Sequence, residues 1–317
     1  MSDPKDVLRS LSEGTRSHLR TNRARLEIKG PDRDKFLHNL TTNDVKGLAV
    51  GRGHETFVTT PQGKTLSYGT VLKLEDRLLY RTEAAGLEAL LAHFAKYGMF
   101  DDVEVVDRTA ATFELHVAGA GAQLPEDAPP DREFDHRLTQ PGGDFLLIRE
   151  RPLGVPGWTL IGPVDQLQSA LDRTSAELRG RFEPLDPDDA ESLRIMAGIP
   201  LFGRDVTTDN LPQEVGRDAR AISFVKGCYL GQETVARLDA LGHVNRLLTR
   251  LSLDSGEVPA DGTPLFFEGK QVGKITSAES GGALALGYVR AQLAVAGTKL
   301  VVGDPNASRC ATCGSDS

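Results

Sequence analysis

The pattern of apolar segments changes at Arg246, and this change restricts the possible fold more than any other feature. Beyond Arg246 the chain consists of short strand-like segments separated by glycines, at residues 247–253, 263–267, 271–277 and 283–289. Regular short strands with glycine turns are typical of a small β-barrel. We therefore predict a barrel over residues 246–303, followed by a polar tail over residues 304–317 that carries Cys310 and Cys313.

The region before the barrel alternates between strand-like and helix-like patterns. Strand patterns cover residues 24–29, 54–60 and 64–74, and helix patterns cover residues 34–40, 86–97 and 186–196. This alternation contains no glycine-rich nucleotide-binding loop, and it predicts an α+β fold with largely antiparallel sheets. The first 22 residues are polar, and we expect them to form a flexible N-terminal segment.

Composition excludes several classes of protein. The net charge is −8 at pH 7, which argues against a broad nucleic-acid-binding surface or a membrane-surface protein. The sequence contains no apolar run of the roughly 18 residues that a spanning helix requires, and the N-terminus lacks the apolar core of a signal peptide. Three cysteines, an odd number, do not form a disulfide framework, so we expect a cytoplasmic protein.

The most informative stretch for function runs over residues 222–237, I-S-F-V-K-G-C-Y-L-G-Q-E-T-V-A-R. Cys228 lies two residues after Lys226 and shortly before a helix that we predict over residues 232–241. A nearby ammonium and a helix N-terminus both favour a nucleophilic thiolate. A buried structural cysteine is the alternative, because cysteine is among the most frequently buried residues.

This stretch closely resembles the signature of the YgfZ family, K-G-C-Y-x-G-Q-E-x-V-A-R. YgfZ proteins are folate-binding-type proteins of iron–sulfur cluster assembly or repair, and they are related to the aminomethyltransferase (T-protein) of the glycine cleavage system. Further similarity lies in residues 30–45 (G-P-D-R-x-K-F-L-x-x-L-T-T-N-D-V), 193–200 (L-R-I-x-A-G-I-P), 272–277 (V-G-K-I-T-S) and 286–289 (L-G-Y-V). The resemblance covers residues from about Arg23 to Gly303.

The resemblance implies a T-protein-like, multi-domain cloverleaf around a central cavity, with two interleaved subdomains in residues 23–245 and a C-terminal small β-barrel. It implies tetrahydrofolate as the cofactor and iron–sulfur client enzymes or assembly factors as partners. By identity with the signature, the expected catalytic residues are Cys228 and Lys226. The expected cofactor-binding residues are Arg194, Tyr229, Gln232, Glu233 and Arg237.

Two of the expected ligand residues have simpler interpretations. Arg194 lies where family members carry an arginine near the ligand cavity, but it could equally be an exposed helical arginine. Arg237 lies four residues after Glu233, at the spacing of an ion pair within a helix. We predict no metal site within the chain.

The sequence departs from the T-protein where that enzyme carries carboxylates. Ser67 and Tyr68 stand in place of an acidic pair on the predicted hairpin, and Met196 stands in place of a glutamate. Loss of these groups removes the means to position an amine and manage its proton, so aminomethyl transfer is not expected.

Two alternative functions remain open. One is a tetrahydrofolate-dependent aminomethyl- or demethyl-transferase. The other is a thiol-redox or metal-delivery module that uses Cys228 with the C-x-x-C pair at Cys310 and Cys313.

Overall fold

The computed structural model describes residues 4–119, 132–139, 145–177 and 182–314. Its first sheet has five antiparallel strands in the order β3-β4-β5-β2-β6. These strands are β2 (Arg23–Lys29), β3 (Gly53–Thr59), β4 (Thr65–Lys73), β5 (Leu78–Glu83) and β6 (Glu104–Asp107). Helices α2 (Arg33–Leu40) and α3 (Leu87–Tyr97) cover one face, where Phe36 and Phe94 pack on Tyr80 and Leu26.

The second sheet has the strand order β11-β1-β7-β10-β9-β8. Its strands are β1 (Thr15–Leu19), β7 (Thr112–Gly119), β8 (His136–Leu138), β9 (Leu146–Glu150), β10 (Gly157–Pro163) and β11 (Phe182–Pro184). Only the β1–β11 pair is parallel among the described strand pairs of this sheet. Helices α1 (Pro4–Glu13), η1 (Val164–Gln166), α4 (Leu167–Glu177) and α5 (Pro187–Met196) accompany it.

The C-terminal part is a closed barrel with the strand order β12-β15-β14-β13-β16-β17. Its strands are β12 (Arg246–Leu253), β13 (Pro264–Phe267), β14 (Lys270–Ala278), β15 (Leu284–Arg290), β16 (Lys299–Val302) and β17 (Cys310–Cys313), with η3 (Ala291–Leu293) after β15. Leu265, Ile275, Val289 and Leu300 fill its interior.

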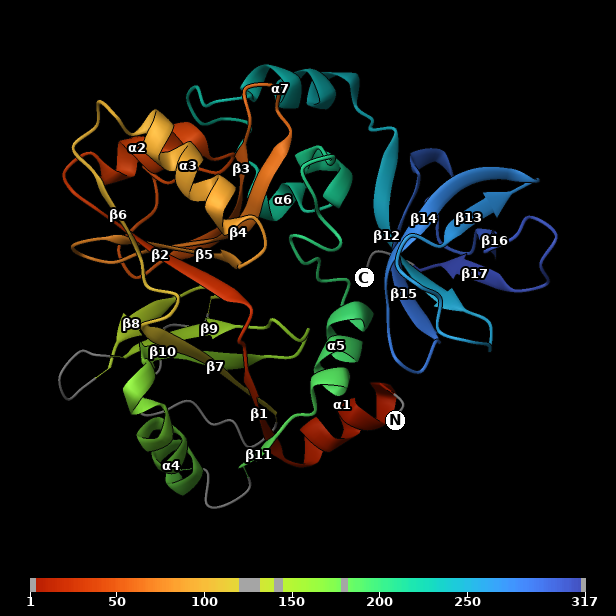
Figure 1. Ribbon diagram of the computed structural model, residues 1–317, viewed down its shortest axis with the longest axis horizontal. Coiled ribbons are helices and arrows are strands. Elements are labelled where there is room, and N and C mark those ends of the chain that lie inside the picture. Colours follow the sequence, from red (N-terminus) through yellow and green to blue (C-terminus); the bar gives the residue numbers. More distant parts are fainter. Residues whose placement is uncertain (1–3, 120–131, 140–144, 178–181, 315–317) are drawn as a thin grey trace.

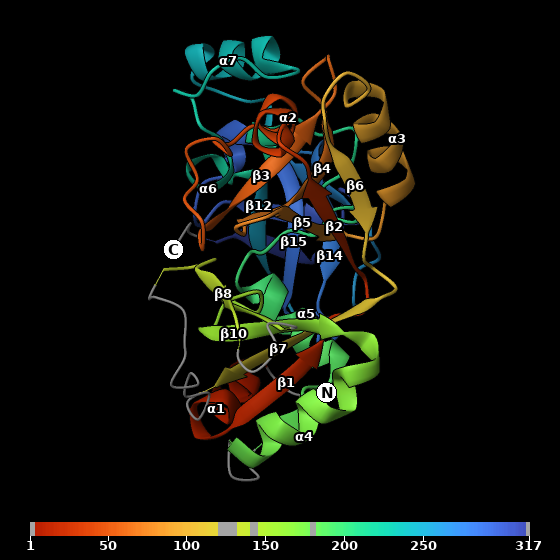
Figure 2. The ribbon, with the colours of Figure 1, turned by 90° about the vertical axis from the view of Figure 1, so that its left-hand side faces the viewer.

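The three parts surround a common centre. Figure 1 shows the first sheet above the second, with the barrel to one side and α5 between the second sheet and the barrel. Figure 2 confirms that the two sheets lie one above the other. The segment from α5 to the barrel crosses back over the first sheet as η2 (Pro212–Val215), α6 (Asp218–Ala221) and α7 (Gln232–Leu241). The predicted α+β cloverleaf with a C-terminal barrel is therefore confirmed.

The chain termini differ from the sequence-based prediction. Within the N-terminal segment that we expected to be flexible, α1 packs Val7 and Leu11 with Leu193 of α5, and β1 lies between β11 and β7 in the second sheet. The polar composition of the first 22 residues did not indicate that they pack against the rest of the fold. A ten-residue helix such as α1 needs only a few apolar residues on its buried side.

The predicted polar tail is likewise part of the fold. Residues 310–313 form β17, which pairs with both β12 and β16 and closes the barrel. Ala311 and Cys313 point into the barrel core and are 0% and 2% exposed. This strand has only four residues and few of them are apolar, so the sequence alone did not distinguish it from a loop.

Truncation after Gly303 tests the role of β17. We expect the free energy of unfolding to fall by roughly 3 kcal/mol or more, because two hydrogen-bonded ladders and two buried side chains are lost together. Urea denaturation followed by circular dichroism would measure this loss. The double substitution Cys310→Ser with Cys313→Ala keeps the strand and should cost only about 1 kcal/mol. Equal stability of the truncated and full-length chains would contradict a structural role for this strand.

Candidate functional site

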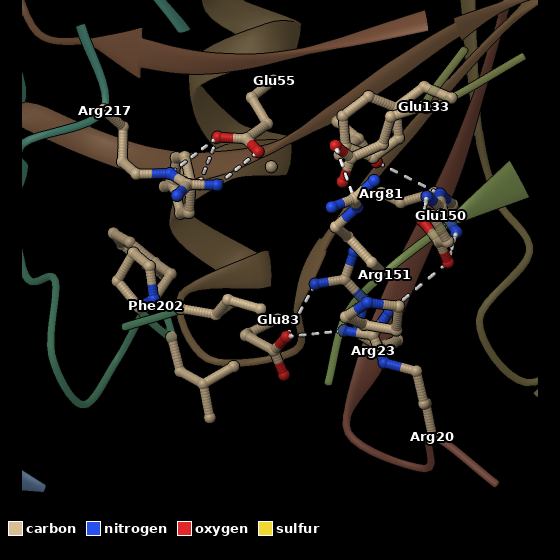
Figure 3. A pocket seen from close by; sticks show the side chains of 18 residues that line it. Arg20, Arg23, Glu55, Arg81, Glu83, Glu133, Glu150, Arg151, Phe202 and Arg217 are labelled. Carbon is tan, nitrogen blue, oxygen red and sulfur yellow. Dashed lines mark hydrogen bonds and ion pairs between the residues drawn. The ribbon is translucent and has the colours of Figure 1, made fainter. Parts of the chain in front are cut away.

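Two adjoining cavities lie at the centre of the fold. The inner pocket has a volume of about 80 Å³ and is shown in Figure 3. The outer cavity has a volume of about 690 Å³. The two share six lining residues, which are Arg20, Arg23, Glu83, Pro152, Ile199 and Leu201. The two cavities therefore adjoin each other along a shared wall, which forms the inner end of the outer cavity.

Buried ion pairs line the boundary between the two sheets. Arg81 of β5 donates to Glu150 of β9, with nitrogen–oxygen distances of 2.6 and 3.2 Å. Arg23 of β2 donates to Glu83 at 2.6 Å, and Arg20 donates to Glu114 of β7 at 2.9 Å. Figure 3 shows Arg20, Arg23, Arg81, Glu83 and Glu150 grouped on one side of the inner pocket.

The charge of this cluster is unbalanced. Burial raises the pKa of the Glu150 carboxyl, but Arg81 and Arg20 outweigh this effect and hold the pKa well below its ordinary value. Glu150 is therefore ionised at neutral pH. Five arginines and four glutamates line the inner pocket, namely Arg20, Arg23, Arg81, Arg151 and Arg217 against Glu55, Glu83, Glu133 and Glu150. The excess positive charge in a region shielded from water favours an anionic ligand.

Glu55 of β3 forms a second polar group on the opposite side of the inner pocket (Figure 3). It accepts four hydrogen bonds, from Tyr68 at 2.6 Å, from Arg217 at 2.6 and 3.0 Å, and from Arg220 at 2.7 Å. Burial raises the pKa of Glu55, but Arg217 and Arg220 hold it below its usual range. A carboxylate offers about four acceptor positions, so Glu55 has none left for a substrate proton.

The outer cavity combines apolar walls with cationic groups. Its apolar lining includes Leu115, Leu153, Leu167, Leu171 and Leu185. Arg20 and Arg23 lie at its inner end, and the buried Nε of Arg23 has no hydrogen-bond partner among the described residues. Burial, together with Arg20, lowers the pKa of His18 to about 4, so this imidazole is neutral at pH 7. The cavity therefore suits a ligand with a flat or apolar body and an anionic end.

Lys226, predicted as a catalytic residue, instead anchors the loop that carries the signature. Its ammonium donates to the backbone carbonyl oxygens of His38, Thr41 and Asn43 at 2.6, 2.6 and 2.9 Å. Burial lowers the pKa of Lys226 to about 7. Three carbonyls match the three N–H bonds of the charged form and favour it. No N–H bond of Lys226 is then left for the Cys228 thiol.

The other signature residues surround the same loop. Cys228 is exposed, and the ring of the buried Tyr229 lies 4.9 Å from the Lys226 nitrogen. Gln232, at the start of α7, accepts a bond from the Tyr229 backbone N–H at 3.4 Å. Glu233 and Arg237 lie on the exposed side of α7. None of these signature residues is among the described residues that line the two central cavities.

Arg194 lines the outer cavity but has no free donor. Its five N–H groups make bonds to two oxygens of Glu191, to the Ile199 carbonyl, to Asp205 and to Ser277 of β14. A guanidinium has five N–H donors, so all of them are used within the protein. Arg194 thus connects α5 to the barrel.

The residues that replace the T-protein carboxylates have different surroundings. Ser67 is buried and accepts a bond from the Tyr80 hydroxyl at 2.9 Å. Tyr68 lines the inner pocket and donates to Glu55. Met196 is partly buried and packs beside Leu193 at the end of α5. The Glu55 carboxylate therefore lies next to Tyr68, but it belongs to β3, the strand that pairs with β4.

Cys310 and Cys313 do not form a redox pair. They lie three residues apart in β17, so their side chains point to opposite faces of the strand and their Cα atoms are about 10 Å apart. Two cysteines more than 7 Å apart cannot be bridged without backbone movement. Burial also raises the pKa of Cys313. Among the described residues, no cluster of three potential ligands is arranged to hold a metal ion.

The sequence analysis missed most of the residues that line the cavities. Arg23, Arg81, Glu83 and Glu114 lie within largely buried strands, in the runs R-A-R-L and Y-R-T-E and in T-F-E-L. Charged residues inside an otherwise apolar strand are a signal for buried ion pairs, since isolated charges are seldom buried. That signal was available but does not identify the partners, which are far apart in the sequence.

Two family models match this chain. The model of the GCVT N-terminal domain matches residues 20–124, and the model of the CAF17 C-terminal β-barrel domain matches residues 246–309. The chain thus combines a region similar to the GCVT N-terminal domain with a region similar to the CAF17 C-terminal β-barrel domain, and the resemblance inferred from the signature is confirmed.

Similar individual proteins agree with this assignment. The tRNA-modifying protein YgfZ of Yersinia pseudotuberculosis is 29% identical over 76% of this chain and 72% of its own length. A putative chloroplastic transferase of Arabidopsis thaliana is 29% identical over 88% of this chain and 66% of its own length. The chain therefore spans about two thirds of that plant relative.

A solved structure supports the fold. The glycine cleavage system aminomethyltransferase T from Bartonella henselae has a TM-score of 0.84, covers 98% of this chain and 88% of its own, and is 20% identical. At this identity the similarity establishes the fold alone. No described helix is both long and apolar enough to cross a membrane.

Exchange of Lys226 for methionine tests its structural role. We expect Lys226→Met to lower the free energy of unfolding by roughly 3 kcal/mol, because three buried carbonyl oxygens lose their partner. Cys228→Ser, two residues away on the exposed surface, should change stability by less than about 0.5 kcal/mol. Chemical denaturation of both variants would compare them directly. A methionine variant as stable as the parent would show that the carbonyls find other partners.

Proposed function

We propose that this protein is a folate-binding-type protein that supports assembly or repair of iron–sulfur enzymes, with tetrahydrofolate bound in the outer cavity. The observation that carries the proposal is the cavity of about 690 Å³, with leucines on its walls and Arg20 and Arg23 at its inner end. Its volume falls within the usual range for small-molecule sites, and its lining combines apolar walls with polar and charged groups that could orient a ligand.

The expected orientation of the ligand follows from the lining. The ring system would pack against the leucines, and a carboxylate would meet Arg20 or Arg23. These two arginines replace Arg194 and Arg237 as the expected anion-binding groups, since Arg194 has no free donor and Arg237 lies on the exposed side of α7. The inner pocket of about 80 Å³ has room for a few waters but not for a ring system. A bound reduced folate would supply a carrier for one-carbon units.

We favour this role over aminomethyl transfer because the chain lacks a free carboxylate at the expected places. Glu55 already accepts four hydrogen bonds, and the Ser67 hydroxyl and the Met196 thioether are poor proton acceptors at neutral pH. A general base must be able to receive the proton of the reacting group. Glu55, Ser67 and Met196 do not provide one in this arrangement.

Cys228 is the proposed point of contact with iron–sulfur clients or assembly factors. The Lys226 anchor fixes the loop, so the exposed thiol has a defined position. Phe224 and Val225, 46% and 97% exposed, lie in the same loop. The Yersinia relatives are named for tRNA modification, and with a net charge of −8 we relate this protein to enzymes rather than to RNA itself.

Tetrahydrofolate binding tests the cavity assignment. We expect saturating tetrahydrofolate to raise the melting temperature, since a ligand that binds only the native state stabilises it. Leu171→Trp should fill the outer cavity and lower the affinity about tenfold or more, and Arg20→Gln should do the same by removing a charged donor. Isothermal titration calorimetry would measure both affinities.

Arg237→Gln is the matched control, because it removes one arginine from the exposed side of α7 and should leave the affinity unchanged. If a folded sample shows no thermal shift with tetrahydrofolate, the folate assignment fails. If Arg237→Gln weakens binding and Leu171→Trp does not, the ligand lies near the signature loop instead.

Genetic complementation tests the thiol. In cells that lack the native gene, Cys228→Ser should fold normally but fail to restore the activity of iron–sulfur enzymes, because serine lacks the thiolate chemistry. The Cys310→Ser/Cys313→Ala double variant should restore it. A working Cys228→Ser variant at normal protein levels would remove this cysteine from the proposed function.

A further inference from the structure

A separate cavity of about 340 Å³ lies where α7 leads into the barrel. Residues of η2, of α6, of the C-terminal end of α7 and of the start of β12 line it. Figure 1 shows α7 connected to β12 by an extended segment, with α6 below α7. The described lining residues of this cavity include none of those that line the two central cavities, so it is a distinct site.

The side chain of Gln213 leaves an unpaired acceptor at this cavity. Gln213 is 5% exposed, and its Nε2 donates to the Val235 carbonyl at 2.6 Å. A carbonyl only accepts, so this bond fixes the orientation of the amide. The Oε1 atom of Gln213 is buried and has no hydrogen-bond partner among the described residues. A buried unpaired acceptor of this kind favours a ligand that donates hydrogen bonds.

The other polar groups of the cavity also accept hydrogen bonds. Asp218 contributes a buried Oδ1 without a hydrogen-bond partner among the described residues, and Asp239 contributes a second carboxylate. His243 Nδ1 lies 2.9 Å from the Leu241 carbonyl, so this nitrogen is the donor and Nε2 carries the lone pair of the neutral ring. The described lining includes no lysine or arginine. The cavity is therefore acidic and rich in acceptors.

The electrostatics of the cavity indicate the sign of the charge that a ligand would carry. Burial, together with the nearby Asp239, raises the pKa of Asp218 to about 6. Asp218 is therefore still mostly ionised at pH 7 in the ligand-free protein, but its charge is less favourable there than in water. A cation in the cavity would relieve both the burial of this charge and the repulsion between the two carboxylates.

The size and the walls of the cavity favour an organic cation over a metal ion. No group of three His, Cys, Asp or Glu side chains among the described residues is placed to hold a metal. The volume of about 340 Å³ is also many times that of one water molecule or ion. Leu238, Val244 and Leu247 supply aliphatic walls that suit a methylene chain.

We propose that this cavity binds a primary alkylammonium group. The ammonium would donate its three N–H bonds to Asp218, Asp239 and Gln213 Oε1, with its alkyl chain against Leu238 and Leu247. A free alkyl diamine and a lysine side chain share this chemistry. The site does not depend on the folate cavity, because the two have no described lining residue in common.

The test uses the full-length protein and 1,4-diaminobutane as the probe. We expect calorimetry to detect one site and thermal denaturation to show a ligand-dependent rise in melting temperature. Asp218→Asn and Asp239→Asn should each weaken binding about tenfold or more, because each removes one charged acceptor. Asp218→Asn should also raise the melting temperature of the ligand-free protein at neutral pH, since an unfavourable charge is removed.

Asp165→Asn is the matched control, because it removes an exposed carboxylate beside the second sheet and should leave binding unchanged. Sodium chloride and magnesium chloride at equal ionic strength separate specific binding from screening and from metal binding. Binding should weaken at about pH 5, where Asp218 becomes protonated and loses the charge that attracts the ammonium.

Three results would overturn the proposal. These are no binding of the diamine to the folded protein, an equal thermal shift with magnesium chloride, and unchanged binding in Asp239→Asn. Since Asp239 is exposed, its substitution should not impair folding. Nα-acetyl-lysine methylamide distinguishes the two sources. Tighter binding of this compound indicates that the natural ligand is a lysine side chain, and tighter binding of the diamine indicates a free amine. Both results support the ammonium site.

Discussion

The buried ion pairs between the two sheets are the interaction on which the centre of this protein depends. Arg81 on the first sheet reaches Glu150 on the second at 2.6 Å, and both side chains are almost completely buried. Removal of one partner from such a pair typically costs about 3–5 kcal/mol, because the remaining charge stays buried without compensation. The sheets are therefore held in one relative position, and the space between them is already formed before any ligand binds.

The same residues give the cavity its chemical character. Arg23 pairs with Glu83 at 2.6 Å yet retains a buried Nε without a hydrogen-bond partner among the described residues. Arg20 is 14% exposed at the side chain and lines both cavities. An anionic group that enters the outer cavity would thus meet donors already held in place, which lowers the entropic cost of binding.

The sequence predicted the architecture better than it predicted the site. The helix over residues 232–241 and the hairpin around Gly63 follow from local patterns, and the structure has both, with Gly63 at φ +75°. The contact between Arg81 and Glu150 joins residues 69 positions apart. No local pattern encodes such a pairing, because it depends on how two sheets pack. The sequence also could not show that all the N–H donors of Arg194 are used within the protein. An arginine with donors free for a ligand would look the same in the sequence.

Identity to a signature does not by itself assign a chemical role to each residue. Within the run from Lys226 to Gln232, Lys226 holds the loop to the end of α2, Tyr229 packs in the core beneath it, and Gln232 bonds to the backbone. These three side chains are turned inward and satisfy the needs of the fold. Cys228 is turned outward, and no such structural need explains its presence at the surface. Lys226, Tyr229 and Gln232 therefore stabilise the loop, and the Cys228 thiol lies exposed on its surface.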